Sequence, residues 1–142
     1  MDITAVGKNT YKIKGKKGSV TVEVGKGVEI VGAANKTVFP INQPGEYEVE
    51  GISVFAYSAG ETLATLVQVE EIRVLVVGNV LSDNIIDEMD AVDVAILGTE
   101  QVGSKALVEM VGKIEPSYIV PSGEESACAT ASIVICLFVL IL

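Results

Sequence analysis

Residues 72–121 read IRVLVVGNVLSDNIIDEMDAVDVAILGTEQVGSKALVEMVGKIEPSYIVP and alternate between apolar runs and amphipathic segments. The apolar runs are rich in Val, Ile and Leu, as buried strands are: Ile72–Val77, Val92–Leu97 and Tyr118–Val120. Between them lie two segments with helical spacing, and each begins at a serine, Ser82 or Ser104, whose hydroxyl can cap a helix. The order strand, helix, strand, helix, strand predicts a parallel or mixed sheet with helices on a face.

The chain before Ile72 is predicted to consist of strands alone. Short alternating or apolar runs are separated there by turns rich in Gly, Lys, Pro and Asn. The expected strands are Asp2–Val6, Thr10–Lys14, Ser19–Val24, Val28–Val31, Thr37–Phe39, a stretch around Tyr47 and Val49, Ile52–Tyr57 and Leu63–Val69. No flexible linker separates the two halves. We therefore expect one α/β domain with an all-strand N-terminal half and a βαβαβ C-terminal half.

Composition excludes one class of partner and indicates a compartment. The 142 residues carry a formal charge of −9 and no histidine, so binding to nucleic acid is not expected, because few phosphate counterions could be released. The N-terminal residues lack the basic-then-apolar layout of a signal peptide. The two cysteines, Cys128 and Cys136, are about 12 Å apart if helical, beyond disulfide reach. Free thiols in a reducing compartment predict a cytoplasmic protein.

The end of the chain is an apolar tail. Residues 127–142 read ACATASIVICLFVLIL, which is shorter than the ~20 apolar residues of a membrane span and has no basic flank. Three interpretations remain open for it. It could cover the core, it could anchor the protein in a membrane through Ile133–Leu142, or it could come from a shifted reading frame. We favour the first, and expect a domain over 1–123 followed by the tail over 124–142.

Four stretches resemble one family when their order and spacing are taken together. They are MDITAVGKNTYKIKGKKGSVTVE, QPGEYEVEGISV, VVGNVLSDNIIDEMDAVDVAILGT and KIEPSYIVPSG. In this order the chain is similar to the metallo-β-lactamase superfamily, and most similar to small zinc-dependent hydrolases of the L-ascorbate-6-phosphate lactonase kind. The resemblance covers residues 1–123. It implies a truncated αβ/βα sandwich of two mixed sheets, which in the family holds zinc as the cofactor of a hydrolase.

The resemblance also locates the family's metal ligands, and the first three are altered here. A Gly-His pair of the family is Gly7-Lys8 in this chain, which puts an ammonium group in place of an imidazole. Asn35 stands where the His-x-His-x-Asp-His loop of the family would begin, and the rest of that loop is absent. Glu23 alone keeps a carboxylate, at a position where the family has Asp.

The remaining ligand positions are altered as well. Ser58 stands for a histidine, Asn79 for the aspartate that bridges two metal ions, and Ser122 or Gly123 for the last histidine. Zinc sites are built from imidazoles, thiolates and carboxylates, with one position open to water. We therefore expect a degenerate site, no zinc, no other cofactor and no hydrolysis by the family's route.

The main hypothesis is an inactive scaffold or interaction domain. Loss of the metal loop is expected to uncover an apolar outer face of the first sheet, which the tail or a second copy of the chain would cover. Two alternatives remain. One is a metal-independent hydrolase that reuses the cleft with Glu23 as general base. The other is a membrane-associated protein held by its tail.

Overall fold

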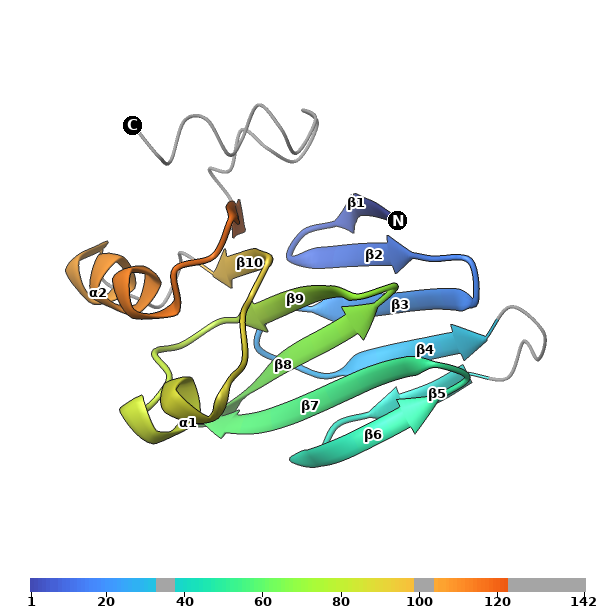
Figure 1. The fold of residues 1–142 in the computed structure, drawn as a ribbon, viewed down its shortest axis with the longest axis horizontal. Helices are drawn as coiled ribbons and strands as arrows, with labels where there is room; N and C mark the ends of the chain where they lie inside the picture. The colour runs from blue at the N-terminus through green and yellow to red at the C-terminus, as the bar shows by residue number, and fades with distance from the viewer. Residues whose placement is uncertain (33–37, 99–103, 123–142) are drawn as a thin grey trace.

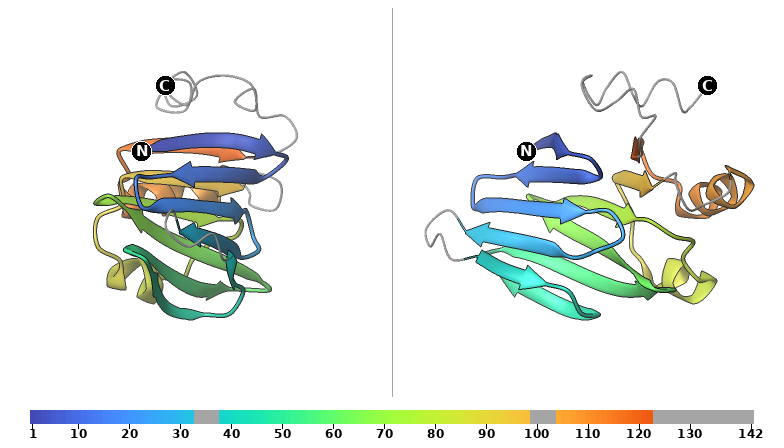
Figure 2. Two further views of the ribbon diagram at one scale, coloured as in Figure 1. Left: turned by 90° about the vertical axis from the view of Figure 1, so that its right-hand side faces the viewer. Right: turned by 180° about the vertical axis from the view of Figure 1, so that it is seen from behind.

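The computed structural model describes residues 1–32, 38–98 and 104–122 of the chain. Within these ranges the protein forms eleven strands and two helices. The strands build two stacked sheets, and both helices lie beside the second sheet (Figures 1 and 2). The described ranges leave out Asn35, Gly123, Cys128, Cys136 and the whole tail. The predictions made for these residues stay predictions.

The first sheet is an antiparallel meander of five strands in sequence order: β1 (Asp2–Gly7), β2 (Thr10–Lys14), β3 (Gly18–Glu23), β4 (Val28–Gly32) and β5 (Val38–Ile41). Its strands alternate between buried and exposed positions. In β3, Val20 and Val22 are fully buried, whereas Ser19 and Thr21 are half-buried. This period of two follows from a sheet with a single covered face.

The second sheet has six strands in the order β11-β10-β9-β8-β7-β6. The antiparallel part comprises β6 (Gly45–Val49), β7 (Ile52–Ala59), β8 (Thr62–Val69) and β9 (Ile72–Val77). The parallel part joins β9 to β10 (Val94–Gly98) and β11 (Tyr118–Ser122). Helix α1 (Asp83–Glu88) connects β9 to β10, and helix α2 (Ser104–Ile114) connects β10 to β11.

One apolar core lies on each face of the second sheet. The core between the sheets includes Ile13 and Ile30 of the first sheet with Val74 and Ile96 of the second. The other core lies between the second sheet and the helices: Leu66, Leu75, Leu97 and Met110 are buried in it, and Ile85, Ile86, Leu107 and Val111 pack against it. The central strands β8, β9 and β10 are therefore covered on both faces, which explains their continuous apolar sequences.

The predicted α/β class is wrong, because the protein is mainly β. The first sheet is antiparallel throughout rather than mixed, and α1 and α2 comprise only 6 and 11 residues. The expected helical C-terminal half is therefore replaced by two short connections on one face of the second sheet. The stacking of two sheets was expected from the resemblance, but in the described residues helices lie beside the second sheet only. Sequence periodicity reports that a face is buried without reporting what buries it.

The outer face of the first sheet is mainly polar over β2, β3 and β4, contrary to the expected apolar face. Lys12, Thr21 and Glu29 are paired neighbours across these strands and all point away from the core. Val31 and Val38 form an apolar pair on this face beside the edge of the sheet. A face of mainly hydroxyl and charged groups is solvated, so it needs no apolar cover.

Strand β5 differs from the expected strand at its C-terminal end. The sequence predicted that the strand would end before Pro40, but β5 continues to Ile41 with Pro40 paired to Glu29. Proline is tolerated there because β5 is an edge strand of the first sheet. Pro121 likewise lies in an edge strand, because β11 is at the edge of the second sheet.

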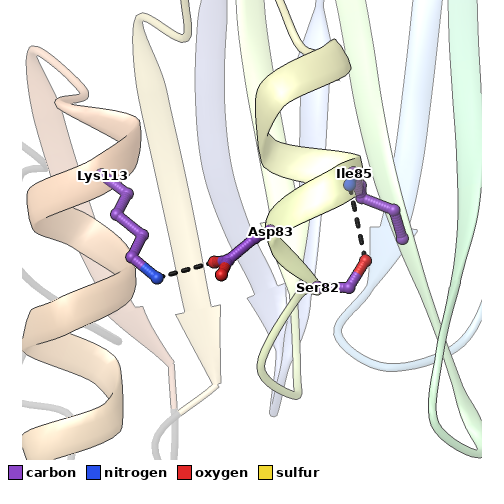
Figure 3. Close-up of polar contacts among 4 residues, drawn as sticks. All are labelled: Ser82, Asp83, Ile85 and Lys113. Carbon is purple, nitrogen blue, oxygen red and sulfur yellow. Dashed lines mark hydrogen bonds and ion pairs between the residues drawn. The ribbon is translucent and has the colours of Figure 1, made fainter.

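The two helices are joined to each other by an ion pair (Figure 3). Ser82 Oγ accepts a hydrogen bond from Ile85 N at 3.4 Å and so caps α1. The next residue, Asp83, accepts a hydrogen bond from Lys113 Nζ of α2 at 2.6 Å. This contact raises the pKa of Lys113, because the neighbouring carboxylate stabilises the ammonium. No helix in the described ranges is long and apolar enough to cross a membrane.

At one end of the sandwich, turns of the two sheets touch. The backbone N–H of Lys16, between β2 and β3, donates to Glu70 Oε1 in the turn between β8 and β9. The terminal amino group of Met1 lies 3.6 Å from Glu70 Oε2. The N–H of Lys16, and secondarily the charge of the amino terminus, holds the pKa of Glu70 below its usual value. This carboxylate therefore links the edges of the two layers.

Candidate functional site

A cavity of about 410 Å³ lies where the parallel strands of the second sheet end. The carboxyl ends of β9, β10 and β11 form one side of it, and the β1–β2 and β3–β4 turns of the first sheet form the other. The lining residues are Lys8, Asn9, Glu23, Val24, Gly25, Lys26, Thr62, Gly78, Gly98 and Ser122. The crevice beyond the carboxyl ends of parallel strands is the usual location of ligand sites in such sheets.

Glycines allow the two sheets to approach at this cavity. A Cβ added to Gly78 would lie 3.2 Å from the Cα of Gly25, and one added to Gly98 would lie 2.9 Å from Val24 Cγ1. Gly25 itself has a φ of 81°, a left-handed conformation that favours glycine. Its carbonyl oxygen accepts a hydrogen bond from Leu63 N at 3.2 Å and thereby connects the first sheet to β8.

A hydrogen bond between Asn9 and Ser122 joins the first turn of the chain to its last described strand. Ser122 is only 1% exposed, and its Oγ donates to Asn9 Oδ1 at 2.7 Å. Asn9 has a φ of 57°, which asparagine tolerates better than most residues. The carbonyl oxygen of Asn9 accepts from Val24 N at 2.9 Å. Two hydrogen bonds thus fix the β1–β2 turn against β11 and the β3–β4 turn.

The β3–β4 turn contributes an ion pair to the cavity. Lys26 Nζ lies 2.9 Å from Glu23 Oε1, and the side chains are 72% and 44% exposed. The backbone N–H of Lys26 also donates to the carbonyl oxygen of Glu23, at 3.0 Å. Because both side chains are in contact with solvent, the pair is weak and its partners can exchange.

The cavity brings together three of the residues that the resemblance singled out. Lys8, Glu23 and Ser122, from β1–β2, β3 and β11, all contribute to its lining. Asn79 directly follows the lining residue Gly78, but its Oδ1 accepts from its own neighbour Val80 N at 2.8 Å, and it is not part of the lining.

Ser58 is exposed on β7 and is also outside the lining. The lining includes three polar residues that sequence reasoning did not select: Asn9, Lys26 and Thr62. Asn9 could have been noticed as part of a Gly-Lys-Asn turn. No local pattern marks Lys26 or Thr62, since their positions depend on how the two sheets stack.

The residues of the cavity do not fit zinc. Of the described side chains that line it, Glu23 carries the only carboxylate, and none is an imidazole or a thiolate. Lys8 and Lys26 add two ammonium groups, which repel a divalent cation. Within the described ranges, no three His, Cys, Asp or Glu side chains come together in a way that could hold a metal ion.

Comparison with solved structures identifies a protein of the same architecture. A crystal structure from Thermotoga maritima, provisionally described as a zinc-dependent hydrolase of the metallo-β-lactamase superfamily, superposes with a TM-score of 0.67. The match covers 96% of this chain and 84% of the other, at 15% sequence identity. The chain has the metallo-β-lactamase fold. The resemblance read from the sequence is thereby confirmed at the level of the fold.

Other comparisons add no closer relationship to this metallo-β-lactamase fold. No family model matches the sequence, and no curated protein matches it significantly. An identity of 15% supports a shared architecture, and activity must be argued from the residues of the site.

Proposed function

We propose that this metallo-β-lactamase-fold protein is a non-catalytic scaffold or interaction domain. The observation that carries the proposal is the donor set of the cavity. Where the resemblance expects metal ligands, the cavity has the Lys8 ammonium, the Ser122 hydroxyl and the Glu23 carboxylate paired with Lys26. Zinc in such a site would supply hydroxide at neutral pH. Without a suitable donor set, the family's hydrolytic route has no source of this nucleophile.

Metal analysis and an activity screen test the proposal. We expect the purified full-length chain to contain substoichiometric zinc after exposure to excess zinc and dialysis. We also expect no turnover of phosphoesters, lactones or thioesters above the background rate. Stoichiometric zinc that is lost in Glu23→Gln, together with turnover, would contradict the proposal directly.

The scaffold role further requires a partner, and self-association is the simplest case. Apolar side chains are exposed on several elements, including Val38 on β5, Val108 on α2 and Tyr118 on β11, which are 48%, 70% and 50% exposed. Sedimentation of the full-length chain, compared with Val38→Ser and Val108→Ser, measures whether these surfaces hold copies together. An unchanged monomer in all three proteins would leave a different protein as the required partner.

A second candidate is a metal-independent hydrolase that uses the same cavity. It is favoured by the convergence of Glu23 and Ser122 on one lining. Glu23 would act as general base toward a water molecule. Glu23→Gln should then abolish any turnover found in the screen, and Glu29→Gln, an exposed carboxylate of the adjacent strand β4, should retain it. Equal rates in wild type and Glu23→Gln would remove this candidate.

The tail-anchored alternative depends on Ile133–Leu142, which lie outside the described residues. Detergent phase partition of the full-length chain tests it. Recovery in the detergent phase would support anchoring, and recovery in the aqueous phase would exclude it.

A further inference from the structure

We propose that the cavity binds a small organic anion, through a carboxylate or phosphate group, at the position where the resemblance predicts metal cations. This inference goes beyond the scaffold role and does not depend on whether the site has any catalytic activity. The residues that line the cavity do not suit the zinc expected in this fold, and two of them are lysines.

The charge distribution around the cavity favours an anion. Among the described residues that line it, two are lysines, Lys8 and Lys26, and one is a carboxylate, Glu23. The first sheet and its turns, residues 1–32, contain six lysines and three acidic residues. The described remainder, residues 38–98 and 104–122, contains three basic and thirteen acidic residues. Lys8 and Lys26 lie at the cavity itself, the other four lysines lie on β2 and in the β2–β3 turn, and a concave surface concentrates the field of the two lysines that line it.

Neutral donors in the lining complement the lysines. Asn9 Oδ1 accepts from Ser122 Oγ, which orients the amide of Asn9. The Nδ2 donors of Asn9 make no hydrogen bond to any residue within the described ranges. Because Asn9 is held in place from both its backbone and its side chain, these donors are fixed before a ligand arrives. An ammonium group together with a fixed amide N–H is a suitable donor set for carboxylate or phosphate oxygens.

Size and net charge limit the class of anion. A cavity of about 410 Å³ accommodates a small molecule rather than a polymer segment. Polyanions such as nucleic acid would be repelled by the rest of the surface, since the whole chain has a formal charge of −9. The exposed Glu23–Lys26 pair is weak enough for Lys26 to exchange its partner for a ligand. A small anion with one or two charges satisfies all of these conditions.

The test is an NMR titration of the ¹⁵N-labelled full-length chain with sodium phosphate and, separately, with sodium acetate. Ionic strength is held constant with sodium chloride. We expect saturable shifts of the backbone amides of Asn9, Gly25 and Gly78. The anion that saturates at the lower concentration identifies phosphate or carboxylate as the preferred group. The absence of saturable shifts with both anions would overturn the proposal.

Matched lysine variants separate a site from general charge attraction. Lys8→Gln and Lys26→Gln are each expected to weaken anion binding about tenfold, the usual effect of losing a hydrogen bond to a charged group. Lys12→Gln and Lys14→Gln remove lysines that are also exposed, but lie on β2 outside the lining, and should leave the affinity unchanged. Equal weakening in all four variants would overturn the site. Zinc binding that shifts the same three amides would overturn it as well, whereas turnover would contradict only the scaffold proposal.

Discussion

The two sheets of this protein bury their side chains in different ways. In the first sheet, β3 alternates between buried valines and half-buried Ser19 and Thr21, because only one of its faces is covered. In the second sheet, Val74, Leu75 and Val76 of β9 are successive residues, and each is at most 1% exposed. Their side chains point alternately into the core between the sheets and the core beneath the helices. The hydrophobic period of a strand thus reports how many of its faces are covered.

The largest difference in the free energy of unfolding is expected between a truncation in the second sheet and one on the outer face of the first. Leu75→Ala is expected to lower the free energy of unfolding by about 2–5 kcal/mol, because it opens a cavity beneath the helices. Thr21→Ala should change it by less than about 0.5 kcal/mol, since Thr21 points outward from the first sheet. Urea unfolding followed by circular dichroism measures both. Similar losses in the two variants would mean that the outer face of the first sheet is covered after all.

A pair of glycine substitutions tests the closest approach of the sheets. Gly78→Ala should cost about 1–3 kcal/mol, because the new Cβ would lie 3.2 Å from the backbone of Gly25. Gly112→Ala in α2 should stabilise the protein by about 0.5–1 kcal/mol, since its Cβ would have no atom within 4 Å and alanine favours a helix. Thermal unfolding of both variants provides the measurement. Stabilisation by Gly78→Ala would show that the sheets can separate there without cost.

The helical layer depends in part on the start of α1. Ser82→Ala should lower stability by about 1 kcal/mol, because Ile85 N loses its capping acceptor. Ser82→Asp restores an acceptor and should recover most of the loss. Urea unfolding compares the three proteins. If the aspartate variant were as unstable as the alanine variant, the cap would not be the cause.

The smallest effect is expected where the sheets are linked by Glu70. The lowered pKa of Glu70 means that its charged form stabilises the folded state. This stabilisation is fully present above the ordinary pKa of glutamate. It is lost as the pH falls through the lowered value. Glu70→Gln should therefore unfold at less urea than wild type at neutral pH, and the gap should close on acidification. A difference in urea midpoint that does not depend on pH would exclude the charge of Glu70 as its source. Glu71→Gln, at the neighbouring position, serves as the control.

The positions of individual strands could be predicted from the sequence, but the class of the fold could not. Strands β2 and β9 lie at Thr10–Lys14 and Ile72–Val77, as local periodicity predicted. The predicted class required more helix than the protein contains: in the described residues, only the second sheet carries helices, and these are 6 and 11 residues long. The sequence predicts that a strand ends at Pro40, but β5 includes this residue, because an edge strand tolerates proline. Which strand lies at the edge is set by pairings between residues distant in sequence.

The candidate site was predictable only where a family motif pointed to it. Lys8, Glu23 and Ser122 were selected by resemblance and do line the cavity, whereas Ser58 and Asn79 do not. Asn9, Lys26 and Thr62 were missed because they meet across the two sheets. Their convergence depends on the close approach allowed by Gly78 and Gly98, a long-range property that no local pattern contains.

The outermost strands carry features that discourage templated growth into fibrils. Pro40 in β5 and Pro121 in β11 each remove a backbone donor from a rim that could otherwise recruit a foreign strand. On the rim formed by β6, Glu46 and Glu48 are both exposed, and the pairing of β1 is irregular between Ala5 and Gly7. Each of the four rims of the described sheets thus resists open-ended strand addition. Contacts of this chain with another protein should therefore use side chains rather than an added strand.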